Sequence, residues 1–198
     1  MTIQPKLILA SGSPRRRELL SLLGLEFQVH SMDVPETVTE ENLDPARMVE
    51  ALSYRKAEAA ALYQITEEGY ILGADTIVAV DGNVLGKPSD ADDARHMLQM
   101  LQGRAHEVYT GVTLLGIEDG KISKKRTFHC RTVVHVHTMD PEEIEDYIRT
   151  GDPFDKAGSY GIQGPFAAYV DGIEGDYQNV VGLPVSMVYR EWRKLTEA

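Results

Sequence analysis

The chain has 198 residues, and its 20 lysines and arginines against 31 aspartates and glutamates give a formal net charge of −11. Apolar residues make up 42% of the chain and charged residues 26%, as in ordinary globular proteins. This composition excludes a disordered chain, which would hold too few apolar residues to form a core. The acidic balance also argues against a general nucleic-acid-binding protein, because such a surface repels phosphate.

The sequence indicates a protein that neither crosses a membrane nor depends on disulfides. No run approaches the ~18 consecutive apolar residues of a membrane helix, and the apolar stretch 7–10 is too short for a secretion signal. Cys130 is the sole cysteine, so no internal disulfide can form. We therefore expect a cytoplasmic location. No repeat or flexible linker divides the sequence, which predicts a single domain over residues 1–198.

The first half of the chain alternates predicted strands and helices. A strand over residues 6–10 leads into a helix that Ser13 caps and Pro14 starts. The elements that follow are a strand at 26–31, a helix at 44–63, a strand at 70–80 and a helix at 90–101. The apolar stripe of the second helix runs from Val49 to Tyr63.

Two hairpin signals accompany these elements and those that follow. Asp81-Gly82 and Asp119-Gly120 are typical hairpin turns, and the latter joins two long strands. Asp140 and Glu143 form a capping box for a short helix. The chain ends with a glycine-rich segment at 152–164, two strand-like stretches and a helix that begins near Pro184. Hairpins mixed with helices predict an α/β fold with a mixed sheet.

The start of the first helix is a candidate anion site. Helix N-termini present unpaired N–H groups and a partial positive charge, which attract anions. Arg15, Arg16 and Arg17 in the first turn would weaken the helix unless an anion binds there. The alternative is a solvated basic turn. The glycine and lysine spacing of a Walker A loop is absent.

Asp75 interrupts an apolar strand. Burying a carboxylate costs several kcal/mol unless it is paired, hydrogen-bonded or bound to a metal. Asp75 is therefore a candidate base or metal ligand, and a structural aspartate is the alternative. Thr76 follows it and faces the other side of a regular strand, so both can line one site only if the chain bends near Gly73.

Two lysines and one loop are further candidates. Lys56 lies on the apolar stripe of its helix, where it either extends to water or points toward a bound anion. Lys87, beyond the first hairpin, either binds the same anion as Lys56 or is an ordinary turn lysine. The loop 155–164 carries glycines at a spacing of three, which permit close approach of a ligand. Its Gln163 can donate to and accept from a base, unless the segment is a mobile surface loop.

Three histidines of the long second strand, His129, His135 and His137, share one face. We interpret them as a solvated face, because no nearby cysteine or carboxylate in the sequence completes a convincing metal-ligand set. Cys130 lies on the opposite face and is predicted to be a small buried residue.

Taken together, five strings of the chain resemble the Maf family of nucleoside triphosphate pyrophosphatases. They are SGSPRRRELL at 11–20, GADTIV at 73–78, LGKP at 85–88, DKAGSYGIQG at 155–164 and VVGLP at 180–184. The resemblance implies a mixed twisted sheet with flanking helices and two lobes around a cleft, similar to the inosine triphosphate pyrophosphatase-like fold. It also implies a homodimer. Ser159 stands where alanine is usual in the family.

The resemblance also implies an activity, hydrolysis of a nucleoside triphosphate to the monophosphate and pyrophosphate. Asp75 would be the proton acceptor, and Arg15, Thr76 and Gln163 would select the base, as in the branch that hydrolyses dTTP and UTP. Modified pyrimidine nucleotides are possible further substrates. One alternative is 7-methyl-GTP, the preference of a branch with other residues at those three positions. Another is a nucleotide-sensing regulator of septum formation with a cell-division protein as its partner.

The expected chemistry needs cations. A divalent ion, Mg²⁺ or Mn²⁺, would be held by Asp75 and Glu36 and would lower the pKa of a bound water. Basic and polar side chains would bind the substrate and offset the phosphate charge. The predicted substrate-binding residues are Ser13, Arg15, Arg16, Lys56, Thr76, Lys87, Lys156 and Gln163.

Overall fold

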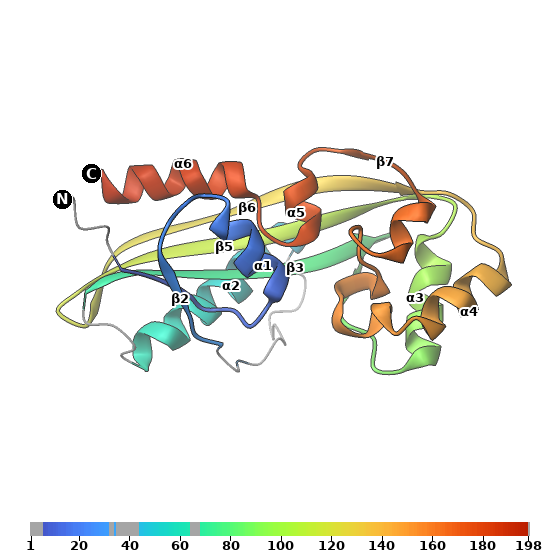
Figure 1. Ribbon diagram of the computed structural model, residues 1–198, viewed down its shortest axis with the longest axis horizontal. Coiled ribbons are helices and arrows are strands. Elements are labelled where there is room, and N and C mark those ends of the chain that lie inside the picture. Colours follow the sequence, from blue (N-terminus) through green and yellow to red (C-terminus); the bar gives the residue numbers. More distant parts are fainter. Residues whose placement is uncertain (1–5, 32–33, 35–43, 64–67, 198) are drawn as a thin grey trace. The chain divides into compact units, whose positions relative to one another are not determined.

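The computed structural model describes residues 6–31, 34, 44–63 and 68–197. In this part of the chain seven strands form one sheet in the order β2-β1-β3-β5-β6-β7, with β4 paired to β3 (Figure 1). The strands are β1 (Leu7–Leu9), β2 (Phe27–Val29), β3 (Gly69–Val80), β4 (Asn83–Leu85), β5 (Ala105–Glu118), β6 (Lys121–Val136) and β7 (Val170–Glu174). β1 pairs with β2 and β3 in parallel, whereas β3–β4 and β6–β7 are antiparallel. The predicted mixed α/β class is confirmed.

Helices flank the sheet, and side chains cap most of their starts. They are α1 (Pro14–Ser21), α2 (Pro45–Leu62), α3 (Ala91–Leu101), α4 (Pro141–Arg149), α5 (Tyr177–Val181) and α6 (Val185–Thr196), with 3₁₀ turns η1 (Asp152–Asp155), η2 (Ala157–Ser159) and η3 (Pro165–Tyr169). The predicted capping box of Asp140 and Glu143 is confirmed. One expectation is wrong, because the second strand-like stretch before Pro184 is the helix α5. None of the helices in the described ranges is long and apolar enough to cross a membrane.

Both predicted hairpin turns are confirmed. Asp81 and Asp119 have φ of 50°, and the glycines that follow have φ of 77° and 69°. Positive φ at two successive residues is what a type I′ turn requires, and such a turn matches the twist of the strands that it joins. The first turn pairs Val80 with Asn83 across β3 and β4.

The chain divides into two compact units. Unit 1 comprises Met1–Asp75, Thr110–Cys130 and Gly182–Ala198, and unit 2 comprises Thr76–Tyr109 and Arg131–Val181. Strands β3, β5 and β6 contribute residues to both units. The single domain expected over residues 1–198 stays a prediction. The candidate site residues are shared between the units, so each unit is described by itself below.

In unit 1, α2 and α6 cover opposite faces of β3 (Figure 1). Tyr70 packs edge-on against Trp192 of α6, with ring centroids 4.9 Å apart. Gly73, three residues further and so on the other face, lies against Ser53 and Ala57 of α2. The buried cluster under α2 comprises Ile8, Ala10, Ala57, Ala60, Ile71, Leu115 and Ile117.

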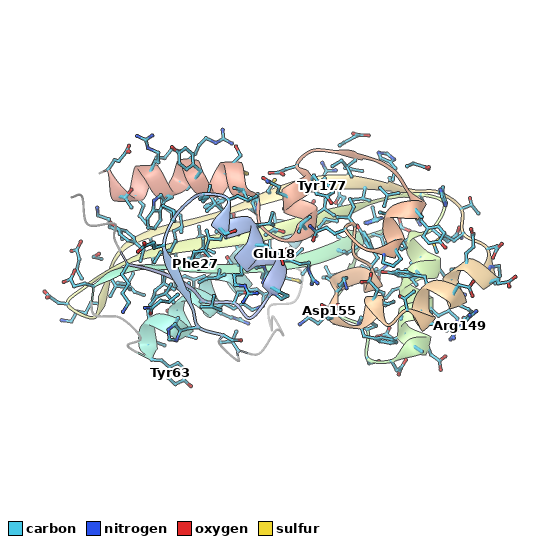
Figure 2. The ribbon with its side chains drawn as sticks, in the orientation of Figure 1. Glu18, Phe27, Tyr63, Arg149, Asp155 and Tyr177 are labelled. Atoms are coloured by element: carbon cyan, nitrogen blue, oxygen red, sulfur yellow. The ribbon has the colours of Figure 1, made fainter. Side chains whose placement is uncertain are left out.

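Two expectations about burial in unit 1 are wrong. Tyr63, one residue beyond the end of α2, is 75% exposed and points away from the strands (Figure 2). The buried part of the apolar stripe therefore ends earlier, at Ala60. Cys130 is half-buried rather than buried.

In unit 2, aromatic side chains surround Phe166, which is fully buried. The rings of Tyr147, Tyr160 and Tyr169 lie 4.6 to 5.6 Å from the Phe166 ring, measured between centroids. Tyr147 comes from α4, whereas the others come from the glycine-rich segment and η3. This cluster therefore attaches the segment 152–169 to α4.

Gly111 on β5 marks a close approach between α2 and the sheet. A Cβ atom at this position would lie less than 3.0 Å from three backbone atoms of Val49 and Glu50. Gly111→Ala should therefore lower the free energy of unfolding by at least about 2 kcal/mol, as measured by urea denaturation. Gly172→Ala on β7 is the control, because a Cβ there meets nothing within 4 Å. Equal stability of the two variants would contradict this close packing.

Candidate active site

Asp75 lies within β3 and is 6% exposed. Side chains alternate along a strand, so Asp75 projects to the same face as Gly73, the face that α2 covers. Because Gly73 has no side chain, the backbone of α2 approaches β3 closely at Ser53 and Ala57. Lys56, which lies between these two residues on the helix, thereby comes within reach of Asp75.

The Lys56 ammonium donates a hydrogen bond to Oδ1 of Asp75, and the two groups form an ion pair. Lys56 is itself only 9% exposed. The expectation that a carboxylate in this apolar strand has a partner is confirmed. Extension of Lys56 to water is excluded, because the charge ends inside unit 1 against the carboxylate. Both charges are thus held largely out of solvent, where Coulomb attraction is stronger than in water.

The start of α1 lies beside the same part of β3. Leu9 of β1 is in register with Leu72, and the Ala10 N–H donates to the Leu72 carbonyl over 2.8 Å. The chain then turns into α1, where the Ser13 hydroxyl accepts from the Arg16 N–H. Unit 1 therefore holds both the capped basic helix start, which follows β1, and Asp75 of the ion pair, which lies on the adjacent parallel strand β3.

One of the three arginines at this helix start, Arg16, binds polar groups of this chain. The Arg16 guanidinium donates to the Gly182 carbonyl over 3.0 Å and to the Ser11 hydroxyl over 3.3 Å. Arg16 therefore ties α1 to the segment that enters α6, a role the sequence did not reveal. Arg15 is half-buried.

In unit 2, backbone contacts bring two predicted lysine segments together. The Gly158 N–H donates to the Gly86 carbonyl over 2.9 Å. A Cβ at Gly158 would come within 3.0 Å of the Val78 side chain, so this turn packs directly on β3. Lys87 follows Gly86 and is exposed, while Lys156 precedes the turn. The structure therefore places the Lys87 and Lys156 segments next to each other within unit 2.

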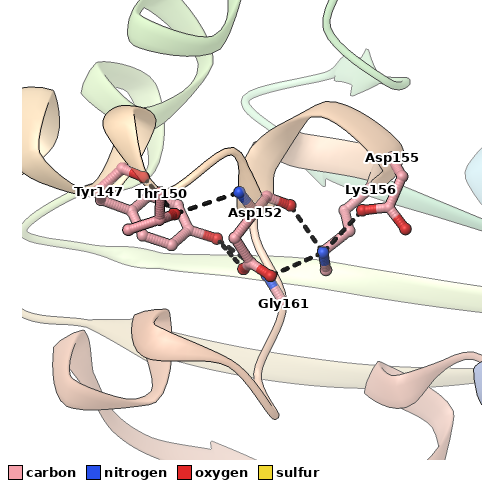
Figure 3. Close-up of polar contacts among 6 residues, drawn as sticks. All are labelled: Tyr147, Thr150, Asp152, Asp155, Lys156 and Gly161. Carbon is pink, nitrogen blue, oxygen red and sulfur yellow. Dashed lines mark hydrogen bonds and ion pairs between the residues drawn. The ribbon is translucent and has the colours of Figure 1, made fainter.

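Lys156 has a full set of acceptors (Figure 3). Its ammonium donates to the carbonyl oxygen of Asp152 over 2.6 Å, to Oδ1 of Asp152 over 2.9 Å and to Oδ1 of Asp155 over 2.7 Å. An ammonium has three hydrogens to donate. A phosphate would therefore have to displace one of these acceptors to bind Lys156.

The remaining predicted residues of unit 2 are Thr76 and Gln163. Thr76 is half-buried on β3, and Gln163 is exposed in the turn between Gly161 and Gly164. Strand β3 continues through Gly73 without interruption, so side-chain alternation directs Asp75 and Thr76 to opposite faces. The substrate-binding roles of Thr76 and Gln163 stay predictions.

The metal ligands are only partly described. Glu36 lies outside the described residues. Within the described ranges, no group of three or more histidine, cysteine, aspartate or glutamate side chains is placed to hold a metal ion. The three histidines, two in β6 and His137 directly after it, pair with separate carboxylates: His129 with Glu50, His135 with Glu174 and His137 with Asp171. Their side chains are 39 to 41% exposed, in agreement with a solvated face.

Comparison with known proteins assigns the chain to a family. The family model for Maf-like proteins matches residues 6–195. The chain belongs to the Maf-like family. A relative in Agathobacter rectalis, named dTTP/UTP pyrophosphatase, is 47% identical over 201 residues, which cover 96% of this chain and 97% of that protein. Another of the same name in Chlorobaculum parvum is 52% identical over 202 residues, covering 98% of this chain and 96% of that one.

One solved structure has a weak likeness to this Maf-like chain. The Staphylococcus aureus Ham1 protein matches with a TM-score of 0.47 and 15% identity, over 66% of this chain and 71% of that one. The family assignment does not depend on this weak likeness.

Sequence patterns missed the polar partners that surround the candidate residues of this Maf-like chain. Asp152 and Tyr147, which accept hydrogen bonds from Lys156 and from the Gly161 N–H of the loop 155–164, were not singled out. In the sequence Tyr147 fits an apolar position of α4. The contacts of its hydroxyl with Asp152 and Gly161 follow no helical or strand spacing. Asp152 carried no signal beyond its place at the start of the glycine-rich segment.

The Lys56–Asp75 pair predicts a specific pattern of stability changes. Lys56→Met should lower the free energy of unfolding by about 3–5 kcal/mol, because it leaves a buried carboxylate without its counter-charge. The double variant Lys56→Met/Asp75→Leu should recover most of that loss in urea denaturation. Arg104→Met is a matched control that breaks the exposed Arg104–Asp81 pair, and its effect should be much smaller. If Lys56→Met and Arg104→Met lowered the free energy of unfolding equally, the buried pair would contribute no more to stability than the exposed one.

Proposed function

We propose that the chain is a nucleoside triphosphate pyrophosphatase that converts dTTP and UTP to the monophosphate and pyrophosphate. The observation that carries this proposal is a buried Asp75 carboxylate, paired with Lys56, in the unit that also contains the basic start of α1. A base and an anion-attracting helix end are what hydrolysis of a phosphoanhydride requires. Nearly full-length relatives named dTTP/UTP pyrophosphatase support the choice of substrate.

Asp75 is the proton acceptor in this proposal. Its Oδ1 accepts a hydrogen bond from Lys56, and a carboxylate has about four lone-pair sites, so it can also accept from a water. The attacking water transfers a proton to Asp75 as its oxygen bonds to phosphorus, and the bridging oxygen between the α- and β-phosphates leaves with pyrophosphate. Lys56 holds the carboxylate in a fixed orientation during this step.

Basic groups bind the phosphates. The N–H groups of the first turn of α1, together with Arg15 and Arg16, offer donors and positive charge to the triphosphate. In unit 2, Lys87 is the basic side chain proposed to bind phosphate. Lys156 can also bind phosphate only if a phosphate oxygen replaces one of its three present acceptors. A chain with a net charge of −11 repels a triphosphate, so these local cations are needed to attract it.

Among the described residues, Asp75 is the one proposed ligand for a divalent cation, Mg²⁺ or Mn²⁺. Asp75 would hold it, with Glu36 as the second ligand that the resemblance implies. Mg²⁺ in nucleotide sites is usually bound by one or two carboxylates and otherwise by phosphates and water, so the absence of a larger cluster among the described residues is compatible with it. When bound, the ion would neutralise phosphate charge and lower the pKa of a coordinated water.

Arg15, Thr76 and Gln163 are the proposed selectors of the base. Gln163 has both donor and acceptor groups, and it is exposed, so a nucleotide base can reach it. A bound base would cover these side chains, so a wrong base would leave their hydrogen-bonding groups without partners, which costs binding energy. We also propose a homodimer in the cytoplasm, with neither nucleic acid nor membrane as a partner. A septum-formation partner remains the alternative role.

A panel of substrates tests the proposed activity. With Mg²⁺ present, the protein should release pyrophosphate and monophosphate from dTTP and UTP faster than from CTP or 7-methyl-GTP, as measured by chromatography of the products. Pseudouridine triphosphate tests the extension to modified pyrimidines. A preference for 7-methyl-GTP would overturn the base assignment. Binding of every nucleotide without turnover would favour a nucleotide sensor.

Replacement of the proposed base tests the mechanism. Asp75→Asn should reduce pyrophosphate release from dTTP at least about 100-fold, because the amide cannot accept the proton of the water. The matched control is Asp119→Asn, the same chemical change in an exposed hairpin turn whose positive φ asparagine tolerates. Circular dichroism verifies that both variants are folded. Near-wild-type turnover by a folded Asp75→Asn protein would remove Asp75 from the mechanism.

A further inference from the structure

Asp152 is the centre of a hydrogen-bond network in unit 2 (Figure 3). Its Oδ2 accepts from the Tyr147 hydroxyl over 2.6 Å, and its Oδ1 accepts from Lys156 over 2.9 Å. The side chains of Asp152 and Lys156 are only 20% and 14% exposed, so the pair is largely shielded from solvent. Both carboxylate oxygens are therefore occupied by groups of this chain.

The Tyr147 hydroxyl links this network to the backbone of the Gln163 turn. It accepts a hydrogen bond from the Gly161 N–H over 3.3 Å while it donates to Asp152. Burial, followed by the hydrogen bond to Asp152, raises the pKa of Tyr147 well above its usual range. The hydroxyl thus keeps its proton at neutral pH and can make both bonds at once.

Two glycines of the same turn lie directly on the network. A Cβ at Gly164 would lie 3.0 to 3.2 Å from the Asp152 carboxyl group. A Cβ at Gly161 would come within 3.0 Å of the Lys156 side chain. The turn that carries Gln163 is therefore shaped at both ends by contact with Asp152 and Lys156. The Gly164 N–H closes it by donating to the Gly161 carbonyl over 3.1 Å.

We propose that Tyr147, Asp152 and Lys156 are positioning residues that hold the Gln163 turn in the conformation that discriminates between nucleotide bases. This inference rests on the proposed function and assigns the Lys156 ammonium to Asp152 and Asp155 instead of to phosphate. An exposed glutamine discriminates poorly if its backbone moves, because hydrogen bonds to a base depend on distance and angle. A turn between two glycines has little stiffness of its own, so the network supplies it.

The network makes base selection depend on residues that do not touch the base. Loss of the Tyr147 hydroxyl would leave the Gly161 N–H without its acceptor and Asp152 without one donor. The turn would then sample more conformations, which weakens binding of the correct base most. Chemistry at Asp75 involves none of these groups, so the Michaelis constant should change more than kcat.

Tyr147→Phe tests the proposal with a single-atom change. The variant should raise KM for dTTP about tenfold, as expected for loss of the one hydrogen bond that joins the hydroxyl directly to the turn, while kcat changes less than about twofold. The preference for dTTP over GTP, expressed as the ratio of kcat/KM values, should fall. In a double-mutant cycle, Gln163→Ala should lower this preference less in the Tyr147→Phe background than in the wild type.

Tyr160→Phe is the matched control. It removes a buried hydroxyl from the same aromatic cluster, but that hydroxyl contacts His106 over 2.7 Å and not the turn. Tyr160→Phe should leave KM for dTTP and base preference unchanged. Equal effects of the two tyrosine variants, or additive effects in the cycle, would overturn the proposal.

Amide hydrogen exchange in the free protein tests the same network without activity. Exchange of the Gly161 amide should be at least about tenfold faster in Tyr147→Phe than in the wild type, and unchanged in Tyr160→Phe. Unchanged exchange in Tyr147→Phe would overturn the positioning role. A wild-type protein that hydrolyses neither dTTP nor UTP would instead contradict the proposed function, and the exchange result would still decide whether the network holds the turn.

Discussion

The buried ion pair between Lys56 and Asp75 is the constraint on which the architecture of unit 1 depends. Removing two charges from water is costly, and their mutual attraction offsets that cost only when the geometry is good. Here the geometry follows from backbone packing, because Gly73 lets α2 approach β3 until Lys56 reaches the carboxylate. The strand, the helix and the charge pair therefore form one interdependent unit.

Unit 2 uses polar contacts for a different purpose. Its glycine-rich segment has little regular structure, and three short 3₁₀ turns replace longer elements. Aromatic packing around Phe166 fixes the segment as a whole, while Tyr147, Asp152 and Lys156 fix one turn within it. Rigid packing and directional hydrogen bonds thus act at two levels in the same stretch of chain.

Much of the fold could be predicted from sequence because its signals are local. Capping residues at Ser13 and Asp140 and the Asp-Gly hairpins concern neighbouring residues, and the structure confirms them. The stretch near Val180 was predicted wrongly as a strand, because a short apolar run does not distinguish a buried helix from a strand. Tyr63 was wrongly predicted to be buried, because an apolar stripe indicates which face of a helix is buried but not where the helix extends beyond the core.

The candidate site could be predicted only in part. Asp75 was recognisable because a carboxylate in an apolar strand needs a reason to be there. Its partner Lys56 could be singled out but not paired with it, since 19 residues separate the two. The partners of Lys156 are local, since Asp152 lies four residues before it and Asp155 is its neighbour in sequence. The contact of the Tyr147 hydroxyl with Gly161 depends instead on how α4 meets the glycine-rich segment, which no spacing rule reveals.

Gly73 has no functional group, yet the placement of the Lys56 ammonium depends on it. Any side chain at this position would push the helix outward and separate the two charges, although every titratable residue would still be present. A variant survey restricted to ionisable positions would miss this requirement. This glycine therefore belongs on any map of mutational sensitivity for this protein, alongside the charged residues that it allows to meet.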